Sequence, residues 1–299
     1  EGGFAPMISN NNQALDLIVS AIKKSGFING KEVFTGNITT QVIPHNHNHI
    51  IARVHLAGKD EMENACKAAV NAQQNWIDIG LESRCEIFEK CADLLAGEWR
   101  MKVNASTMLN QSKTVFQAEI DSACELIDFW RFNCFYARNF HDDLQPLVSP
   151  PGVKNSTEIR PLEGFVLSIT PFNFTSIAAN LPSAPAIVGC TSVWKPSRNS
   201  YLSNYILMQL MMEAGLPDGV INFLPGPGAE ITEVALANPD FAGLHFTGST
   251  ATFQGLWGPA ASHDGVCVDT KDCSGQCGGG GKRDIQSGLC VCDSMQTLA

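Results

Sequence analysis

Four short turns rich in polar residues hold the side chains of this sequence that are best suited to chemistry. Each follows an apolar run typical of a buried strand, so each stands at the carboxyl end of an expected strand. The turns are Thr170 to Thr175, Lys195 to Ser197, Pro225 to Gly228, and Thr247 to Thr250. Open α/β sheets bind ligands at the carboxyl ends of their strands. One such turn is commonplace, but four in succession indicate a ligand site along one edge of a sheet.

The alternation of strands and helices around these turns predicts a parallel sheet. Strand-like runs lie at Gly164–Thr170, Thr191–Trp194, Val220–Leu224 and Gly243–Phe246, with helix-like segments between them at Ser176–Val188, 200–214 and 228–237. Gly215 and Pro217 close the second helix, as expected for a helix C-terminus. Alternation at this spacing is typical of βαβ units. We therefore expect an α/β fold with a Rossmann-like parallel sheet.

The preceding residues are expected to be mostly helical after a loose leader and a hairpin. The predicted elements are a helix at Asn12–Lys24, strands at Ile38–Ile43 and Ile50–Leu56, helices at about 60–76, 82–97, 102–112 and 116–138, and an extended segment at Leu147–Arg160 bent at 150–152. Asp60 and Glu63 form a capping pair for the first long helix. One face of the last helix is expected to carry the apolar residues Phe116, Ile120, Ala123, Ile127 and Trp130.

Composition restricts the class of protein. The 299 residues carry a formal charge of −10 with a pI near 5.1, which argues against binding to a phosphate backbone. No apolar run approaches the ~18 residues of a membrane span, so neither a nucleic-acid nor a membrane partner is expected. His45, His47 and His49 alternate in the hairpin turn and could together face a metal, but no metal site is assigned.

Cysteine usage divides the chain near Gly258. Six cysteines are scattered over the first 257 residues beside apolar neighbours, as expected for small core residues in a reducing compartment. Five more crowd into residues 258–299 with a run of glycines. This Cys-rich irregular tail is expected to be sequence unrelated to the rest, and a small disulfide or metal knot and plain disorder are the alternatives.

Several short sequence motifs narrow the class of protein further. They are Lys113-Thr114-Val115, Gln117 to Asp121, Glu125 to Phe129, Arg160 to Phe165, and Gly248 to Phe253 with Leu256-Trp257. Together with the four turns, they make residues 12–257 resemble the amino-terminal half of the aldehyde dehydrogenases, in the delta-1-pyrroline-5-carboxylate dehydrogenase branch. The resemblance implies oxidation of a small-molecule aldehyde, L-glutamate γ-semialdehyde, to glutamate with NAD in proline catabolism. It also implies the mitochondrial matrix in a eukaryote and otherwise the cytoplasm, and a homo-oligomer paired through a 147–160 hairpin.

The resemblance assigns substrate-side roles to three residues. Asn173 matches the side-chain amide that stabilises the oxyanion of a thiohemiacetal intermediate. Phe174 matches the aromatic residue that lines the aldehyde pocket. Glu119 lies on the helix that borders this pocket, which is a looser assignment. The alternatives are a buried amide in a turn for Asn173 and a solvated helix face for Glu119.

The cofactor-side match runs through the four turns. Thr170, Pro171 and Ser197 belong to the matching turns. Lys195 matches the lysine that hydrogen-bonds the adenosine ribose, with a surface lysine as the alternative. Gly226 and Gly228 would let backbone approach NAD, and Ser249 at the next helix start would meet the pyrophosphate. Arg198 departs from the family, which has an acidic ribose ligand three residues after the lysine, so the resemblance leaves open either tolerance of NADP or weakened NAD binding.

Two catalytic segments of the family have no counterpart in the sequence. Its general-base glutamate and nucleophilic cysteine lie beyond the position of Trp257. We therefore expect a truncated NAD-binding domain at 1–257, a tail at 258–299, no catalytic domain, and no activity of the chain alone. Two other functions are a non-catalytic nucleotide-binding or subunit-pairing fragment and, from the tail, a secreted Cys-rich protein.

Overall fold

The main sheet of the protein has six strands, four of them parallel. The computed structural model describes residues 22–143, 148–261, 281–283 and 290–292. The parallel strands are β6 (Phe165–Ile169), β7 (Thr191–Lys195), β8 (Ile221–Phe223) and β9 (Phe241–Phe246). The strand order is β3-β2-β8-β7-β6-β9, where β2 (Gly26–Ile28) pairs antiparallel with β8 and β3 (Lys31–Val33) pairs antiparallel with β2. The Rossmann-like arrangement predicted from the sequence is confirmed, as a mixed and mostly parallel sheet.

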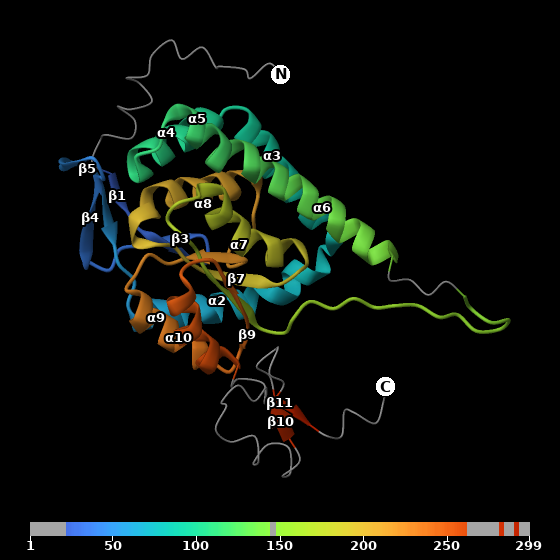
Figure 1. Ribbon diagram of the computed structural model, residues 1–299. Helices are drawn as coiled ribbons and strands as arrows, with labels where there is room; N and C mark the ends of the chain where they lie inside the picture. The colour runs from blue at the N-terminus through green and yellow to red at the C-terminus, as the bar shows by residue number, and fades with distance from the viewer. Residues whose placement is uncertain (1–21, 144–147, 262–280, 284–289, 293–299) are drawn as a thin grey trace.

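Helices cover both faces of this sheet (Figure 1). One face packs on α2 (Lys59–Asp78) and α9 (Gly228–Leu236), with α10 (Thr250–Ala261) beside them. The other packs on α3 (Gly80–Ala96), α7 (Thr175–Ile187) and α8 (Tyr201–Ala214). Neighbouring residues of β7 divide between the faces, since Val193 joins the first core and Trp194 the second. Successive side chains of a strand point to opposite faces of the sheet, so a strand covered on both faces needs apolar residues at consecutive positions.

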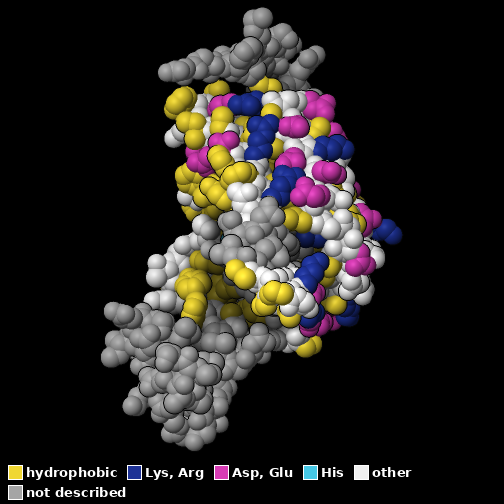
Figure 2. Space-filling model, turned by 90° about the vertical axis from the view of Figure 1, so that its right-hand side faces the viewer, with side chains coloured by type: hydrophobic (Ala, Val, Ile, Leu, Met, Phe, Trp, Pro, Cys, Tyr) yellow, Lys and Arg dark blue, Asp and Glu magenta, His cyan; other side chains and the backbone are white. Residues whose placement is uncertain are grey.

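A smaller sheet and a helical layer complete the described part of the chain. The smaller sheet consists of β1 (Ile22–Lys24), β4 (Ile38–Ile43) and β5 (Asn46–His55), in the strand order β1-β5-β4. The helical layer continues from α3 through α4 (Arg100–Gln111), α5 (Val115–Ala118), the π-helix η1 (Glu119–Cys124) and α6 (Glu125–Asp143). Opposite charges are interspersed on the face in Figure 2, and Arg131–Asp93 and Arg138–Glu89 join α6 to α3. No helix among the described residues is long and apolar enough to cross a membrane.

Several predicted elements have to be corrected. Residues 22–24 of the expected helix at Asn12–Lys24 are strand β1, and its remainder lies outside the described residues. Strand β5 begins at Asn46, inside the expected turn. The cap of α2 is Gly58, whose N–H donates to Glu61 at 2.7 Å, so the Asp60–Glu63 pair was wrong by two residues. Helix α10 includes Gly258, near which the sequence predicts a boundary, and ends at Ala261; the boundary itself stays a prediction.

The helix predicted at 116–138 contains a π-helix. A π-turn closes its hydrogen bonds one residue later than an α-turn, so it shifts the side chains that follow around the helix axis. Phe116 is 75% exposed and Ile120 is 39% exposed, whereas Trp130 is buried completely. The predicted apolar face is therefore confirmed for Ala123, Ile127 and Trp130, which are buried, and is wrong for Phe116 and Ile120.

The segment expected to form an oligomerisation hairpin is extended. Residues 148–160 contain no strand, and they leave the body of the protein as a long arm after α6 (Figure 1). Val148 and Val153 on this arm are 73% and 55% exposed. In the tail, the described residues form one antiparallel pair, β10 (Gly281–Arg283) with β11 (Cys290–Cys292). The rest of the predicted tail lies outside the described residues.

Candidate functional site

The carboxyl ends of β6 and β7 open into a cavity of about 630 Å³ between α9 and α10. Ile169 and Lys195, the last residues of the two strands, lie at its floor. Its walls are small or apolar, and they include Ala229, Thr232, Leu236, Gly255, Leu256 and Pro259. A largely apolar slot with few polar groups is the usual form of a small-molecule site.

Lys195 is the cationic group of this cavity. It is half-buried, and loss of hydration lowers the pKa of its ammonium group. Among the described residues, no carboxylate forms an ion pair with it. A partly desolvated cation without a protein counter-charge is suited to bind a polar or anionic ligand.

Glycine at position 228 keeps the space beside Lys195 open. A β-carbon on Gly228 would stand 3.4 Å from the Nζ atom of Lys195 and 3.7 Å from its Cε atom. Gly226 is constrained more tightly, since a β-carbon there would come within 2.8 Å of the Ala57 carbonyl oxygen. Gly228 therefore lines the cavity, whereas Gly226 allows two backbone segments to approach each other.

The other predicted cofactor residues surround the cavity without lining it. Thr170 is buried, and its hydroxyl accepts a hydrogen bond of 3.0 Å from the indole of Trp194; Pro171 beside it is also buried. The carbonyl of Ser197 accepts from Ser200, and Arg198 is exposed. Ser249 caps α10 by accepting from the Thr252 N–H at 3.2 Å. The cavity therefore brings together Lys195 and Gly228 of the predicted cofactor set.

Asn173 and Phe174 immediately precede α7. Asn173 is exposed, and Phe174 is the N-cap residue of the helix, with extended backbone and no side-chain cap. The ammonium group of Lys113 lies 4.3 Å from the centre of the Phe174 ring, which is a cation–π contact. Asp121 forms an ion pair with Lys113. Lys113 and Asp121 belong to sequence strings that carry the family resemblance, but no local pattern predicts their contact with the turn before α7.

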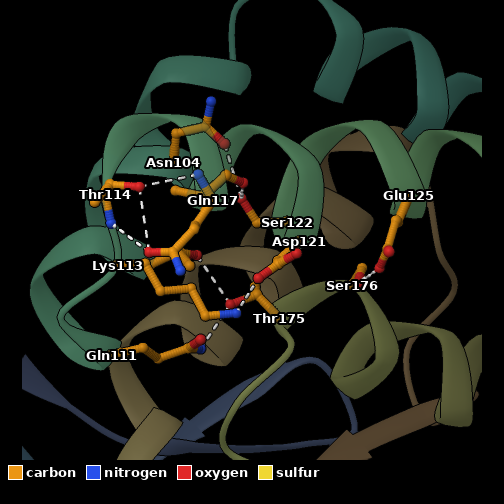
Figure 3. Close-up of polar contacts among 12 residues, drawn as sticks. Asn104, Gln111, Lys113, Thr114, Gln117, Asp121, Ser122, Glu125, Thr175 and Ser176 are labelled. Carbon is orange, nitrogen blue, oxygen red and sulfur yellow. Dashed lines mark hydrogen bonds and ion pairs between the residues drawn. The ribbon is translucent and has the colours of Figure 1, made fainter.

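A polar network holds the first turn of α7 against the helical layer (Figure 3). The hydroxyl of Thr175 lies 2.9 Å from that of Thr107 and accepts from Gln111 at 2.7 Å. The next residue, Ser176, donates to Glu125 at 2.8 Å. These contacts fix the start of the helix and so constrain the turn that carries Asn173. They join residues about 50 to 70 positions apart in sequence, a separation that no local pattern reveals.

Glu119 lies at the start of the π-helix and is bound by two side chains of α4. Burial opposes ionisation of its carboxyl group, but hydrogen bonds from Arg100 and Asn104 lower its pKa below the usual value for glutamate. Asn104 in turn accepts from Ser122 at 2.8 Å. The carboxylate is therefore engaged in joining α4 to the π-helix.

The cysteines of the described body behave as core residues. All six are free; five are buried and Cys124 is half-buried. Burial raises the pKa of Cys66 to about 12 and also raises that of Cys190, so neither supplies thiolate near neutral pH. No cluster of three metal-ligating side chains occurs among the described residues. His45, whose Nδ1 atom lies 2.7 Å from the Ser112 hydroxyl, is in a polar surface contact.

Comparison with known proteins identifies the family. The aldehyde dehydrogenase family profile matches residues 34–279, so the chain belongs to this family. It is 48% identical over 231 residues to a probable delta-1-pyrroline-5-carboxylate dehydrogenase of Schizosaccharomyces pombe, covering 77% of this chain and 42% of that protein. It is 41% identical over 252 residues to the human mitochondrial delta-1-pyrroline-5-carboxylate dehydrogenase, covering 84% of this chain and 44% of that protein.

Solved structures agree with this assignment. The Mycobacterium tuberculosis delta-pyrroline-5-carboxylate dehydrogenase superposes with a TM-score of 0.83 at 45% identity, covering 88% of this chain and 50% of that chain. The same enzyme with bound NAD gives a TM-score of 0.82. The chain thus spans half the length of these relatives or less.

Proposed function

We propose that this chain is the nucleotide-binding half of an enzyme that oxidises L-glutamate γ-semialdehyde, the open form of pyrroline-5-carboxylate, to glutamate with NAD. The observation that carries the proposal is the cavity between α9 and α10, where Lys195 has no acidic partner among the described residues. The names of the relatives support the substrate, and their NAD-bound structures support the cofactor.

The residues of the cavity fit an adenine dinucleotide. Gly228 leaves room beside Lys195 for a sugar edge, which a β-carbon would narrow, and Lys195 would donate to the ribose hydroxyls. Ser249 stands at the amino end of α10, where backbone N–H groups attract a pyrophosphate. When bound, NAD would accept a hydride from the aldehyde carbon. Arg198 is exposed and places no negative charge near this site, so NADP is a second candidate cofactor.

The turn before α7 would serve the aldehyde. The amide of Asn173 would donate to the oxyanion formed at the carbonyl oxygen, and the Phe174 ring would line the apolar side of the pocket. Lys113 and the Thr107–Thr175–Gln111 contacts hold this turn in place. Glu119 would affect the aldehyde pocket indirectly, by joining α4 to the π-helix, because its carboxylate already accepts hydrogen bonds from Arg100 and Asn104.

Two further proposals concern assembly and location. The arm at 148–160 exposes Val148 and Val153 and has no strand partner among the described residues, which favours pairing with a second copy of the chain. Three eukaryotic relatives are named mitochondrial, which supports the mitochondrial matrix as the location.

Calorimetry on the purified chain tests the proposed cofactor. We expect saturable binding of NAD and of ADP-ribose, and weaker binding of both after Lys195→Ala. Lys67→Ala, which removes an exposed lysine of α2, is the matched control and should bind as the wild type does. If the folded wild-type chain binds neither ligand at millimolar concentration, the proposal is wrong.

A further inference from the structure

The nucleotide cavity contains one acidic side chain that has no assigned role. Lys195 and Glu233 are the two charged residues among those that line it. Glu233 lies on α9 and is exposed at the rim, and no described side chain donates a hydrogen bond or forms an ion pair with its carboxylate. An ionised carboxylate in such a position is an available hydrogen-bond acceptor for a ligand.

The spacing along α9 places Glu233 beyond the sugar end of the cavity. Lys195 lies against Gly228, the first residue of α9, and Glu233 is five residues further along the same helix. At 1.5 Å per residue, this separates the two positions by roughly 7.5 Å along the helix axis. The apolar residues Leu236 of α9 and Leu256 and Pro259 of α10 line the same cavity. A nucleoside with its sugar at Lys195 would therefore extend its base along α9, past Glu233.

We propose that Glu233 selects the base of the nucleotide by accepting a hydrogen bond from the exocyclic amino group of adenine. The inference rests on the proposed function, because it assumes an adenine nucleotide in this cavity. A purine with a carbonyl oxygen in place of that amino group would turn an acceptor toward the carboxylate. Two acceptors cannot share a hydrogen bond, and their negative charges repel. The cavity thus discriminates aminopurine from oxopurine nucleotides.

A matched control lies one turn away on the same helix. Glu230 is an exposed acidic residue of α9 that does not line the cavity. Replacing either glutamate with glutamine changes the charge of α9 equally and preserves side-chain size. A difference between the two variants therefore reports on position in the cavity, separate from any general effect of charge.

The test compares NAD with nicotinamide hypoxanthine dinucleotide, whose base carries a carbonyl oxygen in place of the adenine amino group and a hydrogen on the neighbouring ring nitrogen. We expect the wild-type chain to bind NAD more tightly. In Glu233→Gln the preference should shrink by about three- to tenfold, the scale of one hydrogen bond, because an amide can donate to the carbonyl oxygen. Glu230→Gln should keep the wild-type preference.

The outcomes separate the two proposals. If both dinucleotides bind and Glu233→Gln leaves their ratio of dissociation constants unchanged, the inference is overturned while the proposed function stands. If Glu230→Gln shifts the ratio as much as Glu233→Gln does, the effect is one of net charge and the inference is again overturned. If neither dinucleotide binds to the folded chain, the site itself is wrong and both proposals fall.

Discussion

The ammonium group of Lys195 lies 3.4 Å from the point where a β-carbon on Gly228 would stand. Strand β7 and helix α9 therefore meet at a gap that glycine keeps open. The gap faces the cavity, so any ligand that enters between α9 and α10 passes beside the one cation that lines it.

Removing that cation should weaken nucleotide binding. A charge-assisted hydrogen bond contributes ~1.5–3 kcal/mol, so Lys195→Ala is expected to raise the dissociation constant for NAD about tenfold or more. Burial lowers the pKa of Lys195, so the group loses its proton at a lower pH than a free lysine does. Binding should therefore weaken as the pH rises through this lowered pKa, and Lys195→Ala should abolish that dependence. Calorimetry across the alkaline range measures both effects.

Thr170 is expected to stabilise the core through its hydrogen bond with Trp194. In Thr170→Val the buried indole N–H loses its acceptor, which should cost about 1–3 kcal/mol of unfolding free energy. Thr170→Ser keeps the hydroxyl and should cost less. Urea denaturation of the three proteins gives the comparison, and equal losses for valine and serine would contradict the assigned hydrogen bond.

Glu119 should contribute stability that depends on pH. Hydrogen bonds from Arg100 and Asn104, working against burial, lower the pKa of Glu119 below the ordinary value of 4.5. Its contribution is therefore complete above pH 4.5 and is lost as the pH falls through the lowered pKa. Glu119→Gln should lower the unfolding free energy by ~1.5–3 kcal/mol near neutral pH and by less in acid. A constant difference between wild type and variant from neutral pH down to pH 3 would argue against an ionised Glu119.

The chain alone is expected to show no NAD-dependent oxidation of glutamate semialdehyde. Cys66, Cys91 and Cys190 are buried with raised pKa values, so they supply no nucleophile for covalent aldehyde chemistry. A hydrogen bond with Cys134 lowers the pKa of Cys85, but this thiol is completely buried and out of reach of a substrate. The measurement is NADH production by a homogeneous sample, with a full-length relative as the positive control. Steady turnover that tracks protein concentration would falsify this expectation.

Local patterns predicted the parallel core well. The strands β6 to β9 and the helices between them follow from apolar runs and turn residues that lie next to each other in sequence. Strands β2 and β3 were missed because each has three residues, and β2 joins the sheet by pairing Phe27 with Phe223, almost two hundred residues away. No periodicity in a three-residue run signals such a partner.

The candidate site was predictable only in part, for the same physical reason. The turn after β7 pointed to Lys195, and the carboxyl end of this parallel strand places the residue in the lining of the cavity. Its role toward a cofactor stays a prediction. Arg198 was expected beside the ribose, but three residues of 3₁₀-helix follow Ser197 and leave Arg198 exposed, outside the residues that line the cavity. Glu233 was missed because only the packing of α9 against α10 makes it a cavity residue.

The π-helix at Glu119–Cys124 makes the length of this segment as important as its composition. An α-helix turns about 100° per residue, so one extra residue would rotate everything after it by that angle unless a π-turn accommodates the residue. The π-helix thus keeps the phase in which Trp130 donates to Ser183 at 2.9 Å and Glu125 accepts from Ser176 at 2.8 Å. Deleting one residue of this stretch should therefore convert it to α-helix and leave the buried side of α6 in place, whereas the same deletion in the middle of α6 should displace the residues that follow.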